Sequence, residues 1–150
     1  MPTPPHVRKL RLSDLDRILQ IEQASFGKDA YDRNLFAEYF RRCGSLFLVA
    51  DGRGKRGACG YAITCIRGGR AELVSIAVDP ADRGRGAASA LLESTLRRLR
   101  RRGVKRFGLI VRLTNHPARA FYEKYGFRRM RIVRGYYEDG EDGLSMTREV

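Results

Sequence analysis

The sequence predicts a single-domain α/β fold, with a mixed central sheet of about six to seven strands flanked by about four helices. Segments rich in apolar and β-favouring residues alternate along the chain with segments whose apolar residues recur at helical spacing. One glycine-rich turn joins a strand pattern directly to an amphipathic helix pattern. A length of 150 residues suits one core, and no repeat or linker divides it. We therefore expect one domain over residues 6–150.

The first third of the chain predicts a short strand and two helices. Residues 1–5 are proline-rich and are expected to be disordered, and His6–Leu10 has the pattern of a strand. Ser13 and Asp14 have the side chains of a helix start, and the apolar residues that follow recur at helical spacing to about Ala24. A second helix fits Asn34–Arg42, which has an apolar side.

The middle of the chain contains three strand patterns in succession. They lie at Leu46–Ala50, Ala58–Ile66 and Glu72–Val78. Turn signals separate them at Asp51-Gly52 and Gly68-Gly69. Apolar, β-favouring runs between such turns are typical of strands.

Two helices and three strands are expected in the second half. An amphipathic helix runs from about Ser89 to Arg102, and Gly103 ends it. Pro117 suits the first position of another helix, which ends at Gly126. The strands are expected at Phe107–Val111, Phe127–Gly135 and Leu144–Arg148. The first of these is continuously apolar, which predicts burial on both of its faces.

The unusual feature of the composition is a formal net charge of +13. The basic residues concentrate in Arg97–Arg106 and Arg128–Arg134. Leucines at helical spacing give the first stretch an apolar stripe, which puts its arginines on the solvent side of a helix. Two interpretations stay open. The face is either simply solvated, or it attracts anions such as cofactor phosphates, an acidic peptide or nucleic acid.

The three cysteines are an odd number without paired or metal-type spacing. Cys59 and Cys65 fall in an apolar strand pattern and are expected to be small buried residues. No apolar run approaches the roughly 18–20 residues of a membrane span, and no signal-peptide pattern precedes the fold. These observations predict a reduced, cytoplasmic protein with no structural metal and no membrane segment.

The turn Asp79–Ala88 follows a strand and opens a helix. Gly84, Gly86 and Ala88 are small residues at alternate positions, so they leave backbone amides accessible. Free amides and the helix dipole both favour negative charge, which predicts a pyrophosphate site. The Rossmann and P-loop fingerprints are absent. The pattern is R-x-x-G-x-A, starting at Arg83.

A second motif, Asn115–Phe127, follows about one helix and one strand later. Together the two motifs resemble the GNAT superfamily of acetyl-CoA-dependent N-acetyltransferases. The resemblance extends from about Val7 to Val150. It is strongest to the protein N-terminal acetyltransferases, the ribosomal-protein-alanine N-acetyltransferase among them. The supporting segments are Ile21–Phe26, Ser75–Pro80, Val111–Asn115 and Arg134–Met146.

The resemblance implies acetyl-CoA as the cofactor and assigns roles to the residues of both motifs. The amides of Arg85 to Ala88, with Ser89, would hold the pyrophosphate. Strand Ile76–Val78 would pair with the pantetheine arm, and Asn115 would hydrogen-bond to it. Tyr122 would give a proton to the departing thiolate. Its alternative role is aromatic packing. The full implied cofactor set is Ile76, Ala77, Val78, Arg83, Gly84, Arg85, Gly86, Ala87, Ala88, Ser89, Asn115 and Tyr122.

The general base departs from the family pattern. Related N-terminal acetyltransferases often carry Glu or His where this chain has Ile110, which accepts no proton. Glu72, at the start of the preceding strand, is the best substitute, with an ion pair to Arg70 or Arg112 as its alternative role. Ordered water is a further option, because an α-amine has a pKa of roughly 8 and is partly neutral at neutral pH.

On the acceptor side, the resemblance implies that Phe26, Tyr31, Tyr136 and Tyr137 line the substrate channel. Each could instead cover an edge of the core. The Pro-Trp pair common after the phenylalanine is replaced by Gly27-Lys28, so the peptide recognised stays open.

The predicted function is acetyl transfer from acetyl-CoA to a primary amine, most directly a protein N-terminal α-amine, in a ternary complex. No cysteine occupies a motif position that would suggest a covalent intermediate. Two alternatives remain. One is a small-molecule amine or a lysine side chain as acceptor. The other is a nucleic-acid-binding or ribosome-binding module that uses the arginine face, which is also the expected contact for an acidic or ribosomal partner.

Overall fold

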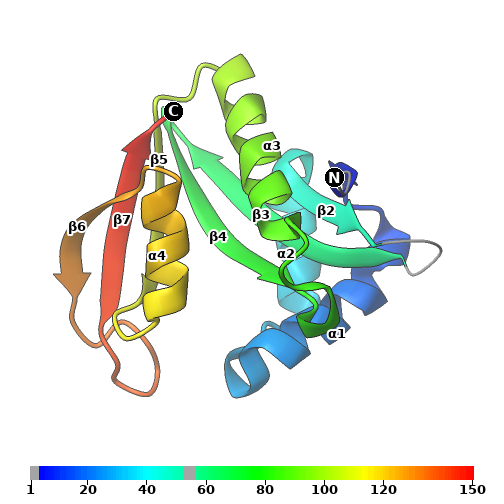
Figure 1. The fold of residues 1–150 in the computed structure, drawn as a ribbon, viewed down its shortest axis with the longest axis horizontal. Coiled ribbons are helices and arrows are strands. Elements are labelled where there is room, and N and C mark those ends of the chain that lie inside the picture. The colour runs from blue at the N-terminus through cyan, green and yellow to red at the C-terminus, as the bar shows by residue number, and fades with distance from the viewer. Residues whose placement is uncertain (1–3, 53–56) are drawn as a thin grey trace.

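The computed structural model describes residues 4–52 and 57–150 (Figure 1). The predicted disorder of residues 1–5 falls mostly on Met1–Thr3, which lie outside the described residues. The strands are β1 Val7–Lys9, β2 Phe47–Asp51, β3 Ala58–Arg67, β4 Arg70–Val78, β5 Arg106–Arg112, β6 Arg128–Val133 and β7 Gly143–Glu149. The helices are α1 Leu15–Phe26, α2 Arg33–Cys43, α3 Ala87–Arg101 and α4 His116–Lys124. Each predicted element is present, with ends shifted by a few residues.

The strands form one mixed sheet in the order β1-β2-β3-β4-β5-β7-β6, which confirms the predicted fold class. All neighbours are antiparallel except β4 and β5. The parallel pairing is short, running only from Arg70↔Arg106 to Glu72↔Gly108. Figure 1 shows the two halves of the sheet diverging from the end where these strands meet. Beyond Glu72, the edge of β4 that faces β5 has no strand partner among the described residues.

A bulge in β4 lies next to this opening. Ile63 of β3 pairs with Ser75 and Thr64 pairs with Leu73, so Val74 has no partner across the pair. A bulge bends a strand and increases its local twist. It therefore helps to turn the end of β4 away from β5.

Helices cover both faces of the sheet. The leucines of α3 and Tyr122 of α4 pack with one face in the larger core cluster. The apolar sides of α1 and α2, including Ile18 and Phe36, pack on the other face with Tyr61. Burying a side chain of this size contributes roughly 1.5–3 kcal/mol, so the two clusters fix the positions of all four helices. The arginines of α3 lie on its exposed side, as predicted from the leucine stripe.

Burial along β5 alternates, which corrects the prediction of burial on both faces. Phe107, Leu109 and Val111 are buried in the core, whereas Gly108 and Ile110 are half-buried. The apolar residues that do not enter the core face the opening between the sheet halves. The apolar run of β5 is therefore continuous because its second face lines a cleft, and not because a second layer of helices packs against that face.

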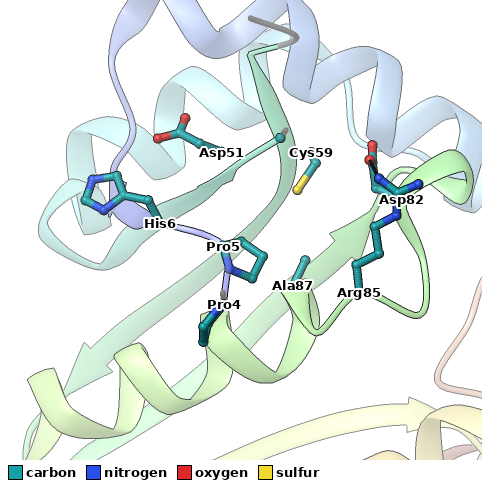
Figure 2. Close-up of a pocket in the computed structure, with 9 residues that line it drawn as sticks. Pro4, Pro5, His6, Asp51, Cys59, Asp82, Arg85 and Ala87 are labelled. Atoms are coloured by element: carbon teal, nitrogen blue, oxygen red, sulfur yellow. Dashed lines mark ion pairs between the residues drawn. The ribbon is translucent and has the colours of Figure 1, made fainter. Parts of the chain in front are cut away.

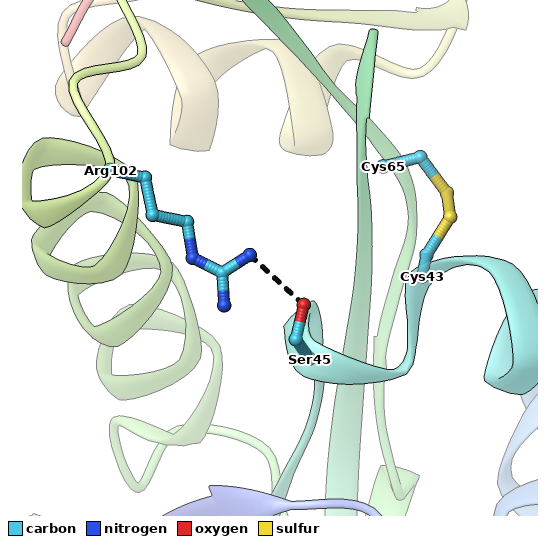
Figure 3. Close-up of a disulfide and its surroundings, with 4 residues drawn as sticks. All are labelled: Cys43, Ser45, Cys65 and Arg102. Atoms are coloured by element: carbon cyan, nitrogen blue, oxygen red, sulfur yellow. Dashed lines mark hydrogen bonds between the residues drawn. A yellow bond between two sulfur atoms is a disulfide. The ribbon is translucent and has the colours of Figure 1, made fainter.

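The prediction that Cys65 is simply a small buried residue is wrong. Cys43, at the end of α2, forms a disulfide with Cys65 of β3, and their Cα atoms are 5.2 Å apart (Figure 3). The partners are 22 residues apart and meet because α2 packs against β3, a contact that no spacing motif encodes. Cys59 is a buried free thiol, as predicted. Within the described part of the chain, no helix has the length and apolar character needed to cross a bilayer.

Candidate active site

A cleft of about 690 Å³ opens where β4 and β5 diverge. Its floor consists of Leu73–Ile76 of β4 and Leu109–Arg112 of β5. One wall comes from the end of α1 and the segment that follows it, and the other from α4 and the β6–β7 loop. The cleft therefore lies between elements from both ends of the sequence, which the open sheet brings together.

The glycine-rich turn lies at the end of β4, before α3. Gly84 and Gly86 have φ values of +80° and +83°, a left-handed conformation that side chains with a Cβ rarely adopt. The first intrahelical bond of α3 runs from Ala90 N to Gly86 O. The amides before Ala90 thus precede the helical ladder and point from a helix N-terminus, which fits a pyrophosphate. A Cβ built at either glycine meets no protein atom within 4 Å, so backbone conformation, rather than crowding within the chain, requires glycine here.

The side chain of Arg85 turns away from this cleft. It forms an ion pair with the buried Asp82, with 3.8 Å between Nη1 and Oδ1. Both residues line a separate cavity of about 220 Å³ that also contacts Cys59 and His6 (Figure 2). Arg85 can therefore contribute its backbone amide to the glycine-rich turn. Its side chain stabilises the turn through the ion pair with Asp82.

Tyr122 of α4 lines the cleft and is almost completely buried. Its ring packs against Phe121 and Phe127, with centroids 5.5 and 5.8 Å away. Tyr122 therefore both packs against neighbouring aromatic rings and lines the cleft. Burial raises the pKa of Tyr122 above its usual value, so the phenol keeps its proton at physiological pH. A retained proton is what a donor to a leaving thiolate requires.

Asn115 also lines the cleft, and it caps α4 by accepting a hydrogen bond from Ala118 N at 3.3 Å. Of the other predicted cofactor residues, Ile76 lines the cleft. Ala77 and Val78 continue β4 toward the phosphate turn and pair with Tyr61 and Gly60 on the other side. The predicted cofactor residues therefore follow one path, from Asn115 and Tyr122 along the unpaired edge of β4 to the turn before α3.

Glu72 is not brought to the cleft. It lies on the exposed side of the chain where β4 still pairs with both neighbours, opposite Cys65 and Gly108. The Arg112 guanidinium forms ion pairs with Asp29, Asp139 and Glu141 instead. The structure thus separates the predicted base from the predicted acid.

Glu22 is a carboxylate of the cleft that sequence reasoning missed. It lies on α1, is 2% exposed and lines the cleft. Its Oε2 accepts a hydrogen bond from Tyr31 N at 3.0 Å, and its Oε1 accepts one from the Tyr61 hydroxyl. Burial raises the pKa of Glu22 to about 7. The available signal was its position on the apolar face of the first helix, where a glutamate needs a buried partner.

The four predicted acceptor residues, Phe26, Tyr31, Tyr136 and Tyr137, all line the cleft. Tyr136 and Tyr137 form an edge-on pair, with centroids 5.0 Å apart. Burial raises the pKa of Tyr137 to about 12. The cleft therefore has a largely aromatic mouth next to Tyr122.

An open mixed sheet, a glycine-rich turn before a helix and a buried tyrosine that lines the cleft are features of acetyl-CoA-dependent N-acetyltransferases. Residues 13–127 match the model of the acetyltransferase (GNAT) family, and the chain belongs to that family.

Known relatives agree with this assignment. The chain is 36% identical to an alanine N-acetyltransferase of ribosomal protein bS18 from Salmonella typhimurium, over 92% of this chain and 93% of the relative. It is 31% identical to an N-alpha-acetyltransferase from Saccharolobus solfataricus, over 95% of this chain and 91% of the relative. The solved structure of Ard1 from Thermoplasma volcanium superposes with a TM-score of 0.92 at 27% identity, covering 99% of both chains.

Proposed function

We propose that this protein acetylates the N-terminal α-amine of a protein or peptide. The observation that carries the proposal is the aromatic mouth formed by Tyr31, Tyr136 and Tyr137 beside Tyr122. These residues come from the segment after α1 and from the β6–β7 loop, so the mouth lies between two loops. Relatives named for N-terminal acetylation, similar along nearly their whole length, support the same acceptor.

The cofactor fits the path already described. The turn at Gly84–Ser89 would hold its pyrophosphate, with Arg83 in the same motif, and the free edge of β4 at Ile76–Val78 would pair with its pantetheine arm. Acetyl-CoA supplies an acetyl group activated as a thioester. Val78 N–H is the proposed donor to the carbonyl oxygen as charge develops there, a contact that typically lowers a barrier by a few kcal/mol.

The reaction proceeds by direct attack. The amine nitrogen would form the new C–N bond and the C–S bond would break. Tyr122 would give its hydroxyl proton to the departing sulfur, and the proton that the nitrogen loses on becoming an amide would restore the Tyr122 hydroxyl. No cysteine among the described residues lines the cleft, which argues against an acetyl-cysteine intermediate. Glu72, the base that the sequence favours, does not line the cleft, so we expect Glu72→Gln to leave the pH–rate profile unchanged. A changed profile would support Glu72 as the base.

The proposal is tested with acetyl-CoA and matched acceptors. One set of peptides has a free N-terminus and no lysine, a second has a blocked N-terminus and one lysine, and a third set contains small amines. We expect mass spectrometry to find one acetyl group on the free N-terminus only. Turnover on lysine or small amines, with none on free N-termini, would overturn the proposed acceptor.

The arginine face is the proposed docking surface for the ribosome. This face consists of the exposed arginines of α3, among them Arg97, Arg100 and Arg101. Phosphate backbones bind such surfaces with a steep dependence on salt. Charge reversal of the three α3 arginines should abolish salt-sensitive cosedimentation with ribosomes and leave acetyl transfer to a short peptide intact. If the charge-reversed variant lost binding to an acidic protein but still bound ribosomes, the partner of this face would be an acidic protein and not the ribosome.

The cytoplasm is the proposed location, because ribosomes and new protein N-termini occur there. The Cys43–Cys65 disulfide is uncommon in that compartment. Trapping free thiols in intact cells before lysis tests the point. A fully oxidised pair in the absence of any oxidising stress would argue against a reducing cytoplasm.

A further inference from the structure

Three buried polar groups join α1 to the floor of the cleft. The Tyr61 hydroxyl donates to Glu22 Oε1 and lies 3.0 Å from Ser75 Oγ. Glu22 and Tyr61 are almost or completely buried, whereas Ser75 is half-buried and lines the cleft. The chain of hydroxyls thus begins at the cleft and ends at a carboxylate inside the protein.

When Glu22 is ionised, the hydrogen-bond directions among these three side chains are determined. A tyrosine hydroxyl has one proton, and that of Tyr61 points to Glu22. The Ser75 hydroxyl must therefore donate to Tyr61 Oη, which leaves the lone pairs of Ser75 Oγ free to accept a proton from the cleft. Because every donor points toward Glu22, a proton that enters at Ser75 displaces one proton at each step.

The reaction requires such an acceptor. An N-terminal amine that binds as an ammonium ion must lose a proton before its nitrogen can attack, and Ile110 occupies the position where relatives often have a base. Three other carboxylates line the cleft: Asp29 is ion-paired with Arg112, Asp32 caps α2 through Leu35 N, and Glu138 is exposed in the β6–β7 loop. Glu22 forms no ion pair within the described residues, so no cation holds its charge.

We propose that Glu22 takes the proton of the acceptor amine through Ser75 and Tyr61. The ammonium proton goes to Ser75 Oγ, the Ser75 proton to Tyr61 Oη and the Tyr61 proton to Glu22 Oε1. The amine is left neutral, and Glu22 is left as a carboxylic acid. The titratable side chains that face Glu22 are Tyr61 of β3 and Tyr31 of the segment before α2, and burial raises the pKa of Tyr31 above its usual value. The raised pKa of Glu22, about 7, lies close to that of an α-amine and suits this exchange.

A purely structural role for Glu22 is the competing explanation, because the same carboxylate holds Tyr31 N. Ser75→Ala separates the two, since it breaks the proton path and leaves both Glu22 contacts in place. Tyr61→Phe breaks the path one step further in, and of the two Glu22 contacts it leaves the one with Tyr31 N in place. Thr64→Val is the matched control, because Thr64 is a fully buried residue of β3 whose hydroxyl has no partner.

The experiment measures kcat against pH with saturating acetyl-CoA and an N-terminal peptide. The parent protein and Thr64→Val should lose activity as the pH falls through about 7. Ser75→Ala and Tyr61→Phe should lower kcat at pH 7 by about 100-fold, with recovery at pH 9 and above, where the amine is neutral without help. This inference rests on the proposed function. An inactive parent protein would refute that function, whereas an active parent with unchanged Ser75→Ala and Tyr61→Phe profiles would overturn only the proton path. Loss of activity in Glu22→Gln alone would also overturn it and assign Glu22 to holding Tyr31.

Discussion

The guanidinium carbon of Arg112 lies 4.1 Å from the centroid of the Tyr137 ring. The same guanidinium contacts Asp29 on one side of the cleft mouth and Asp139 and Glu141 on the other, at 2.7 to 2.9 Å. One side chain at the end of β5 therefore connects the segment after α1 to the β6–β7 loop. Both segments carry residues of the proposed acceptor channel, so the ion pairs of Arg112 hold the two sides of the cleft mouth together.

Replacing Arg112 should affect the acceptor more than the cofactor. Lysine keeps the charge but cannot reach three carboxylates with a planar fork, so Arg112→Lys should raise KM for the peptide on the order of tenfold. The affinity for acetyl-CoA, measured by calorimetry, should stay unchanged. Arg131→Lys is the control, because Arg131 is exposed on β6. An unchanged peptide KM in Arg112→Lys would show that the channel does not depend on this contact.

Tyr122→Phe should lower turnover without weakening the binding of acetyl-CoA. The ring stays packed against Phe121 and Phe127, while the proton donor is removed. Loss of general-acid assistance typically costs about 100-fold or more in kcat. Steady-state kinetics at several pH values check this. Full activity across the range would remove Tyr122 from the chemistry.

Gly86→Val should abolish cofactor binding. A β-branched residue at φ +83° is strained, and its side chain would occupy the face that approaches the phosphates. Gly140→Val is a suitable control, because Gly140 has φ +89° in the β6–β7 loop, far from the phosphate turn. Calorimetry with CoA should find no binding to the first variant and parent-like binding to the second. Parent-like binding by both would refute the assignment of the turn.

Glu22 makes folding stability depend on pH. Its pKa is about 7 in the folded protein and about 4.5 otherwise, so the unfolded chain releases this proton first as pH rises. Stability should therefore fall between about pH 4.5 and 7, by an amount on the order of 3 kcal/mol from this group. Denaturant unfolding of the parent and of Glu22→Gln should differ in slope over that interval. Parallel curves would show that burial does not shift this carboxyl.

The disulfide should stabilise the fold. A link between residues 22 apart removes chain entropy from the unfolded state worth about 3 kcal/mol in the loop-closure model. Cys43→Ser and the reduced parent should unfold at similarly lowered denaturant concentrations. Cys59→Ala leaves the disulfide intact, so we do not expect it to lower the denaturant concentration of unfolding as these two changes do. Reductant that leaves the parent's unfolding midpoint unchanged would contradict the prediction.

Local chemistry made the fold and the donor side predictable. The glycine-rich turn, the helix caps and the apolar spacing are all short-range signals, and they placed each element and the path from Asn115 to the turn before α3. The contacts of Glu22 with Tyr61, of Cys43 with Cys65 and of Arg112 with its three carboxylates join distant parts of the chain. No local pattern records these partners, because only the packing of helices on the sheet brings them together. Position along a strand does not tell where the strand leaves its neighbour, so the sequence favours Glu72 although this residue lies outside the cleft.

The short pairing between β4 and β5 has a consequence for the lifetime of the protein. Three residue pairs join two half-sheets, each with its own helices, and the pantetheine arm is the piece that would bridge the remaining gap. A ligand present at a hundredfold excess over its Kd adds about 2.7 kcal/mol to the stability of the state that binds it. We therefore expect amides along the open edge of β4 to exchange with deuterium much more slowly once acetyl-CoA is bound. Metabolic supply of acetyl groups would then govern both how fast the enzyme works and how long each molecule survives proteolysis.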